Sequence, residues 1–332
     1  MHLVQILRDD ERRVAVVREP ELILVREVTS VLALAQRALA EKRSLTELTR
    51  GLLSEERLPY DDVYTGQSGW KLLAPIDVPG DPQRVLVSGT GLTHLGSARD
   101  RQSMHVKDEA QMTDSMRMFE WGRQHGRPAE DAVGIAPEWF YKGDGSLVRG
   151  PSGALEIPGY AEDGGEEAEV AAIYVIADDG TPWRLGMTTG NEFSDHVFER
   201  RNYLNLAGSK LRTCSIGPEL VVGAEFRDVA GRVKIVRGSQ TLWEREIRTG
   251  EENMCHSLAN LEHHHFKFAA HRQPGTVHIH FMGADCLSYG DGVRLEAGDV
   301  TEIQFDNFGR ALRNTIAKNV PVTASVRVRS ME

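Results

Sequence analysis

Short apolar runs separated by glycine-containing turns dominate the second half of the chain. The run over residues 168–175 is apolar after its acidic opening, which is typical of a buried strand. Turn signals such as Asp178-Asp179-Gly180 follow these runs. The same pattern predicts strands at residues 140–141, 155–157, 168–175, 185–189, 220–222, 233–236, 276–281 and 299–305.

Helical spacing of apolar residues is confined to a few segments. Residues 28–41, 108–126 and 251–270 each carry apolar side chains three and four positions apart, which predicts three amphipathic helices. Ser44 and Glu47 have the spacing of a capping box, in which each side chain bonds the backbone of the other residue. A further helix is therefore expected to begin after Ser44.

The first 75 residues differ in pattern from the rest of the chain. Two strands, at residues 3–7 and 14–18, precede the first two helices and predict a hairpin. We expect a small N-terminal α/β domain over residues 1–75 and a larger, mainly β domain over residues 76–332. The predicted fold class is α+β, mainly β.

Composition narrows the class of protein. The 332 residues are 40% hydrophobic and 27% charged, with a net charge of −10, which is ordinary for a globular protein and does not favour a nucleic-acid partner. The three cysteines have no Cys-x-x-Cys spacing, which argues against structural zinc and a disulfide framework and favours the cytoplasm. No run approaches the roughly 18 apolar residues of a membrane span, and no signal peptide is expected.

Acidic residues open the buried strand at residue 168. Glu167 and Glu169 are two positions apart, so their side chains project to the same side of a strand. Paired buried carboxylates repel each other unless a positive charge lies between them, and Mg²⁺ prefers oxygen ligands. Glu192 closes the next apolar run and could supply a third ligand. The alternative is an acidic cluster at a solvated strand end.

Other polar residues allow both a functional and a structural interpretation. The loop after residue 88 lacks the third glycine of a dinucleotide site, and a turn that presents Thr93 and His94 to a cleft fits it better. Lys142 and Lys210 become functional only beside an anionic substrate. The run of histidines at residues 263–265 is interpreted as surface, because consecutive helical residues point in different directions. His278 and His280 share one face of a strand.

Taken together, an ordered set of motifs resembles the fumarylacetoacetate hydrolase superfamily over residues 70–318. The matching segments are Gly91-Leu92-Thr93-His94, Phe140-Tyr141-Lys142-Gly143, Glu167-Ala168-Glu169-Val170, Gly190-Asn191-Glu192-Phe193-Ser194, Lys210 before Gly217-Pro218, Pro274-Gly275-Thr276, Leu295-Glu296-Ala297-Gly298-Asp299 and Gly309-Arg310-Ala311-Leu312-Arg313-Asn314.

The resemblance implies a rolled mixed β-sheet, a Mg²⁺ or Mn²⁺ ion, a small-molecule 2-oxo acid substrate and a homodimer. It assigns the metal to Glu167, Glu169 and Glu192. Lys142 and His94 are candidate bases, and Lys210 would bind the substrate carboxylate or an oxyanion. The substrate-binding residues that it implies are Thr93, Ser97, Tyr141, Asn191, His196 and Gly283.

Several positions depart from the pattern of the superfamily. Glu192 replaces the usual aspartate, and no His/Glu pair that would activate water is found. The motifs around Glu192 and Lys210 resemble a sugar-acid branch, which implies dehydration of a 2-keto-3-deoxypentonate to 2-oxoglutarate semialdehyde through a metal-stabilised enolate. The alternatives are hydrolysis of a C–C bond in acylpyruvates and a sugar-acid-binding protein without turnover.

Overall fold

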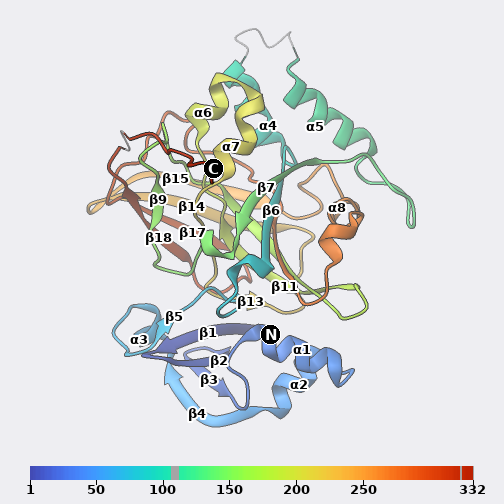
Figure 1. The fold of residues 1–332 in the computed structure, drawn as a ribbon, viewed down its shortest axis with the longest axis vertical. Coiled ribbons are helices and arrows are strands. Elements are labelled where there is room, and N and C mark those ends of the chain that lie inside the picture. The colour runs from blue at the N-terminus through green and yellow to red at the C-terminus, as the bar shows by residue number, and fades with distance from the viewer. Residues whose placement is uncertain (106–111, 322–323, 332) are drawn as a thin grey trace.

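The apolar runs of the chain form the strands of two β-sheets in the computed structural model of the protein (Figure 1). The structure describes residues 1–332 except 106–111, 322–323 and 332. The larger sheet has 13 strands. Its main path runs in the order β4 (Leu53–Pro59), β3 (Glu21–Val25), β2 (Glu11–Arg18), β1 (His2–Arg8), β13 (Leu220–Val221), β11 (Pro182–Asn191), β10 (Ala168–Ile176), β16 (Val277–Phe281), β6 (Val85–Gly91) and β7 (Glu138–Asp144).

Short strands and a second sheet complete the β structure. Beside the main path lie β5 (Lys71–Leu72), β8 (Val148–Arg149) and β12 (Cys214–Ile216). The second sheet has the order β15 (Gln240–Thr249), β14 (Val229–Arg237), β17 (Val300–Phe305), β18 (Leu312–Lys318) and β9 (Leu155–Ile157). Because β16 pairs with β6 in parallel while β10 pairs with β11 antiparallel, the larger sheet is mixed, as expected.

Strand β10 is the centre of the core. All nine of its residues are buried, since each face of the strand packs against a different layer. Ala171 and Ile173 belong to an apolar cluster with the helix α1 (Val31–Ala40). Val170 and Ala172 belong to a second cluster with β14 and β17 of the smaller sheet. Burial on both faces explains why β10 is a continuous apolar run and not an alternating one.

The N-terminal residues form the lower, blue part of Figure 1. This part contains the strands β1 to β4 and the helices α1, α2 (Leu45–Gly51) and α3 (Tyr60–Tyr64). The capping box at Ser44 is confirmed, with the Glu47 N–H donating to the Ser44 hydroxyl. This part is continuous with the larger sheet, because β1 pairs with β13. The domain boundary at residue 75 stays a prediction.

The bounds of the helices differ more from the predicted bounds than those of the strands do. The remaining ones are η1 (Pro82–Arg84), α4 (Leu95–His105), α5 (Asp114–His125), η2 (Gly145–Leu147), α6 (His196–Arg201), η3 (Tyr203–Asn205), α7 (Leu206–Lys210), α8 (Leu258–Phe266) and η4 (Ala269–Arg272). The helix predicted over residues 251–270 was too long, because Ser257 caps α8 and turns precede it. The helix predicted over residues 108–126 begins only at Asp114, and residues 108–111 lie outside the described part. No described helix is long and apolar enough to cross a membrane.

A buried histidine cluster corrects one expectation. His264 and His265 of α8 are buried, so the surface interpretation of residues 263–265 holds only for His263. Trp139 Nε1 donates to His265 Nδ1 (3.1 Å), and His265 Nε2 lies 2.9 Å from His278 Nδ1. The His265 and His280 rings are in tilted contact, with centroids 4.4 Å apart and an angle of 42° between their planes. Burial is the first cause of a lowered pKa, to about 3 for both His278 and His280.

The lowered pKa values of His278 and His280 predict that the protein loses stability in mild acid. The folded protein keeps His278 and His280 neutral down to a pKa of about 3, whereas the unfolded chain binds their protons near pH 6.5. Stability is therefore full above pH 6.5 and falls as the pH drops, by roughly 2 kcal/mol for each histidine at pH 5. Urea unfolding at pH 7.5 and pH 5 measures the loss.

The variant His280→Asn should lose less stability between these two pH values than the native chain. His263→Asn, on the exposed side of α8, is the matched control. An equal pH dependence for His280→Asn and the native protein would contradict the explanation.

Candidate metal centre

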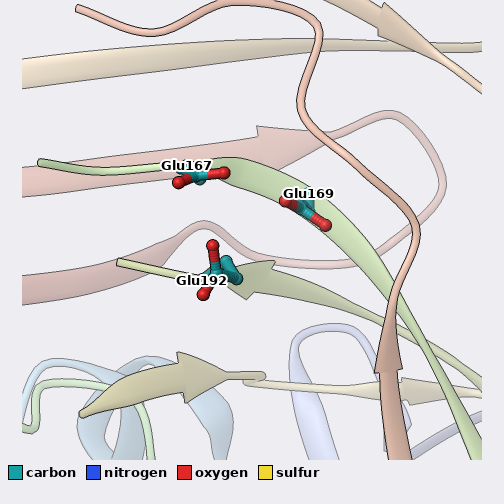
Figure 2. A group of neighbouring side chains, drawn as sticks. All are labelled: Glu167, Glu169 and Glu192. Carbon is teal, nitrogen blue, oxygen red and sulfur yellow. The ribbon is translucent and has the colours of Figure 1, made fainter. Parts of the chain in front are cut away.

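Three carboxyl groups meet where β10 begins and β11 ends. Glu169 pairs with Gly190 in the antiparallel register, and the Glu192 N–H donates to the Glu167 carbonyl (3.0 Å). One carboxylate oxygen from each of Glu167, Glu169 and Glu192 lies within 4.8 Å of the others. Figure 2 shows Glu167 just before one strand, Glu169 on that strand, and Glu192 at the end of the neighbouring strand. All three are at most 5% exposed, so the alternative of a solvated acidic surface is wrong.

Lys210 is the main counter-charge of this centre. Its ammonium group donates to Glu167 Oε1 (2.5 Å), Glu192 Oε2 (2.5 Å) and Ser194 Oγ (2.8 Å). The Phe140 ring lies under it, 4.7 Å from the nitrogen to the ring centroid. Lys210 ends the short helix α7 and is fully buried, so the helix fixes the position of its positive charge.

Lys142 forms a second buried contact with the same carboxylate group. Its Nζ lies 2.8 Å from Glu192 Oε1 and donates to the carbonyl oxygens of Phe193 (2.6 Å) and Lys210 (2.8 Å). Burial lowers the pKa of Lys142, and the charge of Glu192 partly opposes that shift. The two oxygens of Glu192 therefore each contact a different lysine.

Glu169 is held in another way. Its Oε2 accepts a hydrogen bond from the Gly283 N–H (2.6 Å). Burial raises the pKa of Glu169 well above its usual value, and the charges of Glu167 and Glu192 raise it further. A cation next to Glu169 would offset both effects.

Gly283 and Thr93 form the backbone support of Glu169. Gly283 has a φ of +98°, and a Cβ there would lie 2.0 Å from Thr93 Oγ1. The Thr93 hydroxyl donates to the Met282 carbonyl (2.8 Å), which fixes the loop after β16. Of these two predicted substrate-binding residues, Gly283 contacts Glu169 directly, and Thr93 contacts the loop that carries Gly283.

His196 and Asn191 both contact Glu167. His196 Nε2 lies 3.2 Å from Glu167 Oε1. Burial lowers the pKa of His196, but the hydrogen bond to Glu167 and its charge outweigh burial, so the pKa lies above the ordinary value. The Asn191 amide oxygen accepts from the Glu167 N–H (3.3 Å), and its amide nitrogen donates to Thr301. The structure brings both residues to the centre.

Three predicted residues have other contacts. His94 lies between two hydroxyls, with Nδ1 2.9 Å from Thr93 Oγ1 and Nε2 3.1 Å from Thr249 Oγ1, and burial lowers its pKa to about 4. Ser97 donates to the His94 carbonyl at the start of α4. Tyr141 is 45% exposed, whereas the next residue of β7, Lys142, is buried. Their roles in binding or catalysis stay predictions.

Sequence reasoning missed three neighbours of Lys210. Phe140 lies under its ammonium group, and Ser194 bonds both Lys210 and Glu192. Glu199 Oε1 lies 3.7 Å from Lys210 Nζ and accepts from the Ser209 hydroxyl (2.5 Å). Ser194 could have been found, because it stands in the motif of Glu192. Glu199 lies on α6, a helix of six residues, which is too short for its sequence pattern to show which face is buried.

The donor set fits a hard divalent cation. Carboxylate oxygens are the ligands that Mg²⁺ and Mn²⁺ prefer, and each residue can direct one oxygen to a shared point. Burial, together with the charges of Glu167 and Glu192, raises the pKa of Glu169, and a cation bound beside it would favour the ionised form. Glu167, Glu169 and Glu192 are therefore suited to hold such an ion.

No protein-family model and no curated protein matches the sequence. Solved structures do match over almost the whole chain. A 2-keto-3-deoxy-D-arabinonate dehydratase in its apo form is similar with a TM-score of 0.71 and 19% identity, covering 96% of this chain and 99% of the other. A 2-keto-3-deoxy-D-arabinonate dehydratase complexed with magnesium and 2,5-dioxopentanoate is similar with a TM-score of 0.70, 19% identity and the same coverage.

A 5-carboxymethyl-2-hydroxymuconate delta-isomerase from Mycobacterium smegmatis is also similar, with a TM-score of 0.58 and 17% identity, covering 96% of this chain and all of the other. At such identities the likeness establishes the fold. The fold of the fumarylacetoacetate hydrolase type is thereby confirmed.

The tight contact between Gly283 and Thr93 gives a testable prediction. Gly283→Ala places a Cβ against the Thr93 hydroxyl at a positive φ, so it should destabilise the protein by about 2–4 kcal/mol and move the Gly283 N–H away from Glu169. Thermal unfolding measures the loss.

Gly292→Ala is the matched control, because Gly292 has a φ of +84° with nothing within 4 Å of the added Cβ. It isolates the backbone strain from the clash. Equal losses in the two variants would show that the contact with Thr93 contributes nothing.

Proposed function

We propose, on the basis of the fold shared with these dehydratase structures, that this chain is a divalent-metal-dependent hydro-lyase of the fumarylacetoacetate hydrolase superfamily. Its substrate would be a 2-keto-3-deoxy sugar acid, a pentonate. Its product would be 2,5-dioxopentanoate, which is 2-oxoglutarate semialdehyde. The observation that carries the proposal is the buried centre of Glu167, Glu169 and Glu192 with its two lysines.

The three glutamates would hold Mg²⁺ or Mn²⁺. When bound, such an ion supplies a Lewis acid that polarises the 2-oxo group and favours loss of the neighbouring C3 proton. The protein contributes a water-poor environment, since all three carboxyl groups are buried. Electrostatic interactions are stronger in such a setting than in water.

Lys210 would stabilise the negative charge that develops when the C3 proton leaves. Its ammonium group is fixed by three hydrogen bonds, so little reorganisation is needed during the reaction. In the net reaction the C3 proton and the C4 hydroxyl leave as water, and the unsaturated acid rearranges to the aldehyde. His196 and the Gly283 backbone contact the glutamates, and Thr93 bonds the loop that carries Gly283; these residues would border the substrate.

We further propose a cytoplasmic homodimer. The three cysteines, Cys214, Cys255 and Cys286, are all free, which supports a reducing compartment. Light scattering on the purified protein tests the dimer directly.

The function is tested by turnover. With Mg²⁺, 2-keto-3-deoxypentonates should give 2,5-dioxopentanoate, followed as an aldehyde by mass spectrometry. Glu169→Gln should lower kcat/KM by about 100-fold or more, because a lost metal ligand removes several kcal/mol of charge stabilisation.

Glu166→Gln is the matched control, because Glu166 is equally buried but bonds the Ser288 N–H and hydroxyl instead of the centre. Release of pyruvate and a carboxylic acid from acylpyruvates would favour the C–C hydrolase instead. Binding of the pentonate without turnover would leave a non-catalytic sugar-acid-binding protein.

A further inference from the structure

Lys142 is held by three oxygen atoms in the protein interior, two as hydrogen-bond acceptors and one in an ion pair. An ammonium group offers three N–H donors, and the Lys142 nitrogen has three oxygen neighbours within 2.8 Å. They are the Phe193 carbonyl (2.6 Å), the Lys210 carbonyl (2.8 Å) and Glu192 Oε1 (2.8 Å). The side chain is 0% exposed, so no solvent competes for these donors.

The oxygen neighbours of Lys142 are the Glu192 carboxylate and two carbonyl oxygens of the main chain. These contacts fix the Lys142 nitrogen against a predicted metal ligand and against the backbone.

The three acceptors of Lys142 belong to the two segments that build the centre. Glu192 and Phe193 follow β11, and Lys210 ends α7. The buried ammonium group of Lys142 therefore links the Glu192 carboxylate to the backbone of Lys210. Glu192 is long enough to direct Oε1 to Lys142 and Oε2 to Lys210 and Ser194.

We propose that Lys142 is a positioning residue that sets metal affinity through Glu192 and through the backbone of Lys210. The inference rests on the proposed metal site and replaces the role of base that the motif suggested for Lys142. Partners that orient a metal ligand from outside typically change metal affinity by 10–100-fold when they are removed. The aspartate usual in the superfamily would be one methylene shorter than Glu192.

The test is a titration of the purified full chain with Mn²⁺, followed by electron paramagnetic resonance without substrate. Lys142→Met, which keeps the apolar stem, should weaken Mn²⁺ binding about 10–100-fold. Lys71→Met, an exposed lysine on β5, is the control and should bind as the native chain does. Thermal unfolding in EDTA reports the fold of each variant separately.

A double-mutant cycle gives the readout that a merely structural role would not produce. Glu192→Gln should weaken Mn²⁺ binding, and adding Lys142→Met to it should weaken binding by less than Lys142→Met does alone. Native Mn²⁺ affinity in Lys142→Met with lost turnover would overturn the proposal, since Lys142 would then act on the substrate. Additive effects in the cycle would also overturn it.

If Lys142→Met does not fold, Lys142→Gln takes its place in the titration and in the cycle, with the same supporting and overturning outcomes. Titration of the native protein tests the metal site separately from the role of Lys142. If the native protein binds no Mn²⁺, the metal site itself is wrong. This result does not depend on the outcome of the dehydratase assay.

Discussion

The balance of buried charge at the junction of β10 and β11 is the constraint on which the rest of this structure depends. Three carboxyl groups lie out of water there, which is unfavourable unless cations are held in contact with them. Lys142 and Lys210 supply that contact from β7 and α7, which are distant in the chain. Burial first, and then the charges of Glu167 and Glu192, raise the pKa of Glu169, so a further positive charge at this point would favour its ionised form.

The core supports this centre by holding β10 rigidly between two layers. Each face of the strand packs into a separate apolar cluster, so the positions of Glu167 and Glu169 follow from the packing of Ala171 and Val170. The same alternation separates the glutamates from the histidine cluster. Ala171 pairs with Phe281 and Ala172 with His280, so His280 projects to the opposite face of the sheet from Glu169. His278 and His280 therefore lie on the side of α8, where both contact His265, and they do not reach the metal centre.

Sequence pattern predicted the elements that are continuous and apolar, and it failed where long-range contacts decide the structure. The strands at residues 155–157 and 168–175 and the capping box at Ser44 were found, since their signals are local. The spacing of Glu167 and Glu169 located two carboxylates, but only the β10–β11 register shows how close Glu192 lies. Burial of His265 could not be predicted, because its partners come from β7 and β16.

The pairing of β1 with β13 makes the N-terminal residues part of the same hydrogen-bonded ladder as the metal centre. Leu3 pairs with Leu220, and Val221 of the same strand pairs with Met187 of β11. A chain shortened to its larger part would therefore leave the outer edge of β13 with open backbone groups, next to the strand that leads to Glu192. β13 is only two residues long, so the edge that would be opened is short. In the full chain β1 covers this edge, and the N-terminal residues thereby border the strand that leads to Glu192.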